Sequence, residues 1–415
     1  MRVLVFDFSG HPFQAQLSRE LGRRGHDVTH AWCDAYVSGH GRLEAGPGET
    51  VRFEPVSVGR TIAKTSYLRR SLQELRLGVD LVRFVRRARP DVVLVSTTPV
   101  PMLVMLAATL WLRRTPWVLW HQDVQAVAVA RLAGTKLSPI FGALARALEW
   151  GERWGSRRAA AIVVITEAFR SVHEKWGTAD KVTVIPNWAP LDEISPRPRD
   201  NDWAVTQGLD EEQTLLYSGT LGLKHDPELL VELAAAVRAQ GTPVRLVVVN
   251  EGPAVPVVRA AAARLSVPLS LLPFQPYADL PDVLASGDLL VVLLEQDAGE
   301  FSVPSKTLSY LAAGRPVLGL MPPENLAAGL VLDAGGFIAP PLRSSLGPAA
   351  LWADQVLRDP ARLAQLGAES RLLAEKEFAL EGCADQFESI LDSVLPTSVL
   401  PFRRGRARPF ALSGK

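Results

Sequence analysis

An uninterrupted apolar run at residues 289–294, Leu-Leu-Val-Val-Leu-Leu, constrains the fold more than any other stretch of this chain. A strand that is apolar on both faces has to be covered on both faces, as happens in a parallel sheet flanked by helices. Short, mostly apolar runs recur at residues 3–6, 91–95, 117–120, 161–165 and 245–249, with helix-length segments between them. The pattern predicts doubly wound α/β architecture.

The length of 415 residues fits two domains rather than one core. We expect an N-terminal Rossmann-like domain at residues 1–188 and a proline-rich linker at 189–212. A C-terminal Rossmann-like domain would follow at 213–395. The basic segment 396–415 has no hydrophobic periodicity and is expected to be disordered.

Charge is distributed unevenly between the two halves. Residues 1–187 contain 26 Lys and Arg against 16 Asp and Glu, and the remainder contains 19 against 28. This asymmetry predicts an anionic partner for the N-terminal half, such as a membrane surface or a lipid-linked phosphate. Nucleic acid is disfavoured, because no basic motif interleaved with aromatic residues is present.

The two cysteines, Cys33 and Cys383, are too few for a disulfide framework or a zinc site, which favours a reducing compartment. The N-terminus runs directly into the first strand without a signal peptide, so a cytoplasmic location is expected. The apolar residues 100–112 are too few to span a bilayer and predict a buried helix. Shallow insertion, with Trp111 and Trp117 at the interface, is the alternative.

Within the basic N-terminal half, residues 75–83 predict a helix with a basic face. Leu75 and Val79 have the spacing of a buried helix face, and Arg76 and Arg83 fall on the opposite face. That basic face is either solvated or in contact with anionic lipid.

The loop and helix after residue 294 predict an anion site. Pro304 suits a helix start, and Ser305 or Thr307 can cap it. The N–H groups at a helix N-terminus and the helix dipole favour a phosphate, and Lys306 adds a positive charge. A lysine that is merely solvated is the alternative, and the local sequence does not separate the two.

A similar arrangement follows the strand at residues 214–217. Gly219 and Gly222 let the backbone approach a ligand closely, and Lys224 is placed to meet its charge. In the N-terminal half, His121 and Asp123 lie at the C-terminal end of a strand, where ligands bind in such sheets. Asp123 can position or deprotonate a hydroxyl group. The alternative is a capping Asp beside a packed His.

Several of these segments resemble the family-four retaining glycosyltransferases, and most closely the subgroup that builds colanic acid and related exopolysaccharides. Val-Pro-Ser-Lys-Thr-Leu-Ser-Tyr-Leu-Ala-Ala-Gly-Arg-Pro-Val-Leu at residues 303–318 resembles the nucleotide-sugar loop of that family. Residues 121–123 resemble its His-x-Gln-Asp motif, and 185–188 its Ile-Pro-Asn-Trp motif. Residues 219–224 resemble its diphosphate loop, and 274–277 its base-binding loop.

This resemblance implies the GT-B fold, in which two Rossmann-like domains face each other across a cleft. The N-terminal domain would bind a lipid-linked or other glycan acceptor, and the C-terminal domain a nucleoside diphosphate sugar. Sugar transfer would retain the anomeric configuration, would serve cell-surface polysaccharide synthesis, and would need no metal or other cofactor. The enzyme could lie at the inner face of the membrane.

The resemblance also implies roles for individual residues. Gly10 and His11 would form the cleft loop on the acceptor side. Catalysis would rest on His121, Asp123 and Lys224. Donor binding would involve Gly219, Thr220, Lys224, Asn250, Phe274, Glu300, Ser305, Lys306, Thr307 and Ser309.

The sequence departs from the family in four positions. Ser309 stands where many relatives have the Glu that binds ribose, and Asn250 stands where they have Gly. Glu300 is one residue out of register, and Thr220 lies near a usual Arg. Two alternatives therefore remain: a GT-B nucleotide-sugar 2-epimerase, and a non-catalytic GT-B partner subunit.

Overall fold

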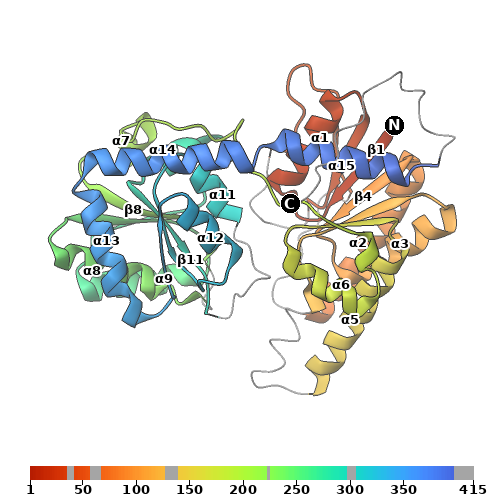
Figure 1. Ribbon diagram of the computed structural model, residues 1–415. Helices are drawn as coiled ribbons and strands as arrows, with labels where there is room; N and C mark the ends of the chain where they lie inside the picture. The colour runs from red at the N-terminus through yellow and green to blue at the C-terminus, as the bar shows by residue number, and fades with distance from the viewer. Residues whose placement is uncertain (35–41, 57–66, 127–138, 222–224, 297–304, 397–415) are drawn as a thin grey trace, which may run out of the picture.

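The computed structural model describes residues 1–34, 42–56, 67–126, 139–221, 225–296 and 305–396. Two α/β domains lie side by side in Figure 1, each built around its own sheet. The described residues do not include Lys224, Glu300 or the tail after residue 396, so the structure does not test their predicted roles.

The N-terminal sheet has seven described strands, all parallel, in the order β3-β2-β1-β4-β5-β6-β7. Their bounds are β1 Arg2–Asp7, β2 Asp27–Trp32, β3 Arg52–Pro55, β4 Val92–Ser96, β5 Trp117–His121, β6 Ala161–Val164 and β7 Val182–Val184. The order reverses between β1 and β4, so the C-terminal ends of these strands open onto a crevice.

The C-terminal sheet has six described strands, also all parallel, in the order β10-β9-β8-β11-β12-β13. Their bounds are β8 Gln213–Ser218, β9 Val244–Val249, β10 Leu269–Leu272, β11 Leu289–Leu293, β12 Val317–Leu320 and β13 Phe337–Ala339. Every residue of β4, β5 and β11 is buried. The apolar runs therefore form central parallel strands, and the predicted doubly wound architecture is confirmed.

Helices connect the strands and cover both sheets (Figure 1). In the N-terminal half they are α1 Pro12–Arg23, α2 Tyr67–Ala88, α3 Val100–Arg113, α5 Pro139–Arg158 and α6 Arg170–Trp176. The rest are α7 Asp202–Thr206, α8 Glu228–Gln240, α9 Ala254–Leu265, α10 Leu280–Ala285, α11 Ser305–Ala312, α12 Leu326–Asp333, α13 Leu346–Leu357, α14 Pro360–Glu377 and α15 Leu380–Val394.

The last helix crosses back from the C-terminal to the N-terminal domain. In Figure 1, α14 lies over the C-terminal domain and α15 continues across α1 and β1. The ring of Phe387 lies 4.7 Å from the Trp120 ring and 6.3 Å from the Trp188 ring, centroid to centroid. Residues 380–394, which the sequence analysis grouped with the C-terminal domain, thus complete the core of the N-terminal one.

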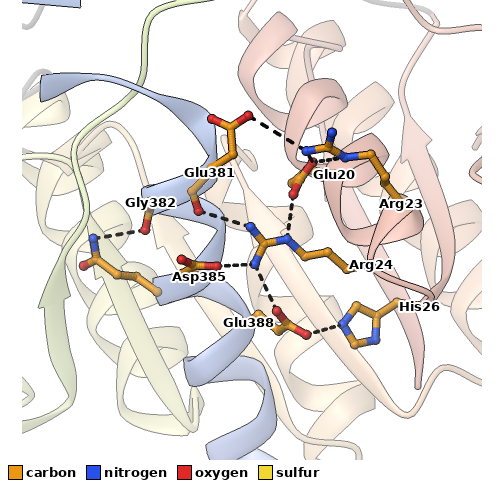
Figure 2. A network of polar contacts seen from close by, with 9 residues as sticks. Glu20, Arg23, Arg24, His26, Glu381, Gly382, Asp385 and Glu388 are labelled. Carbon is orange, nitrogen blue, oxygen red and sulfur yellow. Dashed lines mark hydrogen bonds and ion pairs between the residues drawn. The ribbon is translucent and has the colours of Figure 1, made fainter. Parts of the chain in front are cut away.

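Polar contacts hold α15 in this place (Figure 2). The Arg24 guanidinium, at the end of α1, contacts the carboxylates of Asp385 at 2.6 Å and Glu388 at 3.0 Å. His26 Nε2 lies 3.1 Å from the second oxygen of Glu388. Because Arg24 and Glu388 are largely buried, this cluster orients α15 more firmly than exposed ion pairs would.

The predicted buried face of α2 was wrong, and so was one anchor residue of the membrane-insertion alternative for residues 100–112. Leu75 and Val79 are exposed on α2, and Leu77 and Leu81 are buried instead. Trp117 is buried in β5 and cannot be an interface anchor, whereas Trp111 is exposed. Leu77 and Leu81 also follow helical spacing, so the apolar pattern of this helix fits more than one face.

Candidate active site

A cavity of about 430 Å³ opens where the two domains face each other. Its walls come from the loops after β1, β4 and β5, and from Thr220 after β8 of the other domain. The polar side chains that line it are Ser9, His11, Thr97, Thr98, His121, Gln122, Asp123, Gln125, Glu152 and Thr220. His121 and Asp123, which the sequence placed at the end of a strand, therefore share one cavity with His11 of the predicted cleft loop.

The buried carboxylate of Asp7 organises the first loop of this cavity. It accepts hydrogen bonds from the backbone N–H groups of Ser9 and His11 and from the hydroxyl of Thr97. Gly10 has a φ of 68°, a left-handed conformation that favours glycine. Burial disfavours the charged form of His11, but the hydrogen bond and charge of Asp7, with the charge of Asp123, outweigh it and raise the His11 pKa.

The His-Gln-Asp segment at the end of β5 presents three different environments. His121 is buried, Gln122 is part-buried and Asp123 is exposed toward the cavity. Gln122 and Asn187 exchange two amide hydrogen bonds, of 3.0 and 3.1 Å. The Gln therefore joins this segment to the Pro-Asn-Trp segment at the start of the linker, and Asp123 remains available to a ligand.

Lys306 lies in the first turn of α11 and reaches the loop after β8. Its Nζ donates a hydrogen bond to the Tyr217 hydroxyl and lies 3.8 Å from the centre of the Tyr217 ring. A Cβ at Gly219, whose φ is 129°, would stand 3.3 Å from the same Nζ. Burial lowers the pKa of Lys306 to about 7. The two predicted phosphate loops therefore meet at this lysine.

Hydrogen bonds of two tyrosines shape that meeting point. The Tyr217 hydroxyl donates to the carbonyl of Thr220 at 2.8 Å. The Tyr310 hydroxyl accepts from the N–H of Ser218 at 2.9 Å and donates to its carbonyl at 3.1 Å. Burial raises the pKa of both phenols, so both remain protonated. Neither tyrosine was singled out in the sequence, where each reads as an ordinary apolar position of a strand or a helix.

The other predicted donor-side residues differ in accessibility. Ser305 is exposed at the start of α11 and Ser309 is part-buried. Thr307 is fully buried, and its hydroxyl has no hydrogen-bond partner among the described residues. Because Thr307 is buried, it cannot contact a nucleotide-sugar donor in this conformation.

Two further residues lie on loops of the C-terminal domain. Buried Asn250 accepts a hydrogen bond from the Leu221 N–H at 3.1 Å and so supports the loop after β8. Phe274 is 45% exposed, and its N–H donates to Glu251 at 3.1 Å. An exposed ring on this loop is available to stack on a planar ligand.

No three His, Cys, Asp or Glu side chains within the described ranges are close enough to hold a metal ion. Among the helices that the structure describes, none has the length and apolar character needed to cross a bilayer.

Residues 11–188 match the family described as "Glycosyl transferase 4-like domain". The putative colanic acid biosynthesis glycosyl transferase WcaI of Escherichia coli is 27% identical over 236 residues. That alignment covers 55% of this chain and 57% of WcaI, so it spans little more than half of that relative. The alpha-D-kanosaminyltransferase of Streptomyces kanamyceticus is 21% identical over 70% of each protein.

Solved structures share the fold over nearly the whole chain. Anabaena Alr3699/HepE in complex with UDP and glucose has a TM-score of 0.68 at 17% identity, covering 95% of this chain and 100% of that one. A sucrose-phosphate synthase from Thermosynechococcus elongatus has a TM-score of 0.67 at 14% identity, with 95% and 98% covered. The chain therefore contains a glycosyl transferase 4-like domain at residues 11–188, and as a whole it has the GT-B fold.

Proposed function

We propose that this protein transfers a sugar from a nucleoside diphosphate sugar to a lipid-linked glycan, with retention of anomeric configuration, in the synthesis of a cell-surface polysaccharide. The observation that carries the proposal is the position of Lys306. It lies beside Gly219, and Thr220, the next residue, lines the cavity that also contains His121 and Asp123.

A diphosphate bound at Gly219 would replace the tyrosine contact of Lys306. The lysine is only partly exposed, so its charge would act on the diphosphate in a region of low dielectric. Negative charge on the leaving nucleoside diphosphate grows as the glycosidic bond breaks, and the N-terminus of α11 and the ammonium of Lys306 both stabilise it. Asp123, across the cavity, would position the attacking hydroxyl of the acceptor.

The related proteins agree with a nucleotide-sugar donor. HepE has been solved with UDP-glucose as well as with UDP and glucose. WcaI is named for colanic acid biosynthesis, which supports a polysaccharide acceptor for the present chain.

Thermal-shift measurements with nucleoside diphosphates and their sugars test the donor site. We expect at least one to raise the melting temperature, and Lys306→Ala to abolish that rise. Lys376→Ala, at an exposed lysine on α14, is the matched control and should behave as wild type. No shift with any nucleotide would contradict the proposal.

Product analysis tests the reaction. The anomeric configuration of the product of the best donor and a glycan acceptor should match that of the donor, and inversion would refute retention. Incubation with donor alone separates the alternatives: free epimerised sugar would identify a 2-epimerase. Donor binding without turnover on any acceptor tested would favour a non-catalytic subunit.

We further propose that the helices α2, α3 and α5, which pack side by side, rest on an anionic membrane that carries the acceptor. Their exposed residues combine apolar and basic side chains, as lipid-binding surfaces do. These residues are Leu75, Arg76, Val79, Arg83, Trp111, Leu112, Arg113, Arg114 and Trp150.

Sedimentation with vesicles tests this surface. We expect binding to vesicles rich in anionic lipid, weaker binding at high salt, and loss of binding in Trp111→Glu combined with Leu112→Glu. Leu372→Glu, at another exposed leucine on the C-terminal domain, is the control and should still bind. Equal binding by both variants would contradict this surface.

A further inference from the structure

A histidine that lines no part of the cavity lies directly behind His121. His173, on α6, is completely buried, and its Nε2 is 3.2 Å from Nδ1 of His121. Its own Nδ1 is 3.0 Å from the hydroxyl of Thr178, just beyond the end of α6. A hydrogen-bonded chain thus runs from the cavity wall through two imidazoles to a threonine.

Aromatic rings complete the enclosure of His121. Trp176 stacks against the His121 ring at 6.1 Å with an interplanar angle of 28°, and Phe169 meets it edge-on at 6.0 Å. Trp176 is itself held by a hydrogen bond from its indole N–H to Glu149, at 3.2 Å. Because all three neighbours come from residues 169–176, one short segment determines the orientation of the ring.

The contact with His173 leaves one nitrogen of His121 for other partners. Nε2 of His121 lies 3.8 Å from the carboxylate of Glu152, which is too long for a hydrogen bond. That carboxylate instead accepts from the N–H groups of Gln125 and Ala126, at 2.8 and 3.1 Å. His121 and Glu152 both line the cavity, so Nε2 is the nitrogen on the ligand side.

His173 is suited to hold this bond without carrying charge. Burial, together with the charges of the neighbouring His121 and Arg170, lowers its pKa to about 3, so it is neutral at physiological pH. A neutral imidazole donates with one nitrogen and accepts with the other. The Thr178 hydroxyl can do either, so each tautomer of the pair engages Nδ1 of His121 and leaves Nε2 free.

We infer that His173 is a positioning residue: it holds Nδ1 of His121 so that Nε2 faces the transferred sugar in the cavity. This inference rests on the proposed function, because it assumes a sugar beside His121. It assigns no substrate contact to His173 itself. Its effect should therefore appear in turnover and leave binding of the nucleoside diphosphate unchanged.

Two substitutions at one position test the role. His173→Leu removes the hydrogen bond, and we expect it to lower kcat by about 3–10-fold, the usual value of one hydrogen bond. The affinity for the nucleoside diphosphate alone should stay at the wild-type value. His173→Gln can still bond to Nδ1 and should recover much of the lost kcat.

His30 offers a matched control. It is also fully buried in the N-terminal domain, and it bonds to one hydroxyl, Ser18 Oγ, at 2.8 Å. His30→Leu should reduce the melting temperature as His173→Leu does and leave kcat unchanged. If both variants lost kcat equally, lower stability alone would explain the effect of His173→Leu, and the inference would be overturned.

Nitrogen-15 NMR of the histidine rings gives a readout that needs no turnover. The Nδ1 resonance of His121 should shift in His173→Leu and return toward its wild-type position in His173→Gln. An unchanged resonance would overturn the inference. Failure of the proposed function would look different, because wild-type protein would then bind no nucleotide while the NMR result stood.

Discussion

Lys306 should make donor binding depend on pH in a definite direction. Its pKa in the free protein is about 7, because burial disfavours the ammonium. A bound diphosphate stabilises the ammonium and raises that pKa toward the usual value for lysine. Donor affinity should therefore be highest below the pKa that Lys306 has in the free protein, and it should fall as the pH rises through that pKa.

The size of the effect follows from the protonated fraction of Lys306. About half of the molecules carry the ammonium at pH 7 and only about 3% at pH 8.5, so affinity should fall ~15-fold over that range. At pH 8, binding should take up ~0.9 proton per donor molecule. Isothermal titration calorimetry measures both, the second from buffers of different ionisation enthalpy.

Two variants isolate the lysine. Lys306→Met should bind more weakly than wild type at pH 7 and lose the pH dependence, because no titrating group remains at this position. Lys306→Arg should also show a flat profile, because a guanidinium stays charged throughout. The reasoning is refuted if wild-type affinity is constant between pH 7 and 8.5, or if Lys306→Met keeps the wild-type slope.

Three further perturbations have defined outcomes. Gly219→Ala forces a side chain into a φ of 129° and against Lys306 Nζ, so the KM for the donor should rise and the unfolding temperature should fall; an unchanged KM would contradict the geometry. Phe387→Ala should lower the free energy of unfolding of the N-terminal domain by ~3–5 kcal/mol in urea titrations, and a change below 1 kcal/mol would mean that α15 is not part of that core. Asp7→Asn removes the charge that outweighs burial at His11, so NMR titration should find a lower His11 pKa than in wild type; an equal or higher value would show that another group controls it.

Sequence periodicity predicts the two sheets because of how their strands are buried. A strand with apolar residues on both faces is usually buried in a parallel sheet that helices cover on both sides. The run at 289–294 accordingly forms the central strand β11. The proximity of Lys306 and Gly219 also follows from the sequence. Gly219 directly follows β8, and Lys306 begins the helix that follows the adjacent strand β11, so both lie at the edge of the sheet where the C-terminal ends of these parallel strands meet.

Other features depend on contacts that no local pattern encodes. The amphipathic pattern of residues 380–394 predicts a buried face without saying which domain covers it. His173 is 52 residues from His121, and α6 brings them together only after β6 has joined the sheet beside β5. The predicted roles of Lys224 and Glu300 remain predictions from the sequence.

The crossing of α15 has a consequence for how the protein is made. The N-terminal domain is discontinuous, because Trp120 and Trp188 lack one neighbouring ring until Phe387 has been synthesised. Domains usually fold on the ribosome in the order in which they emerge. Here the half that emerges first is the last to close, so a nascent chain stalled before residue 380 should expose aromatic surface to chaperones even though the seven strands that the structure describes in this half are already translated.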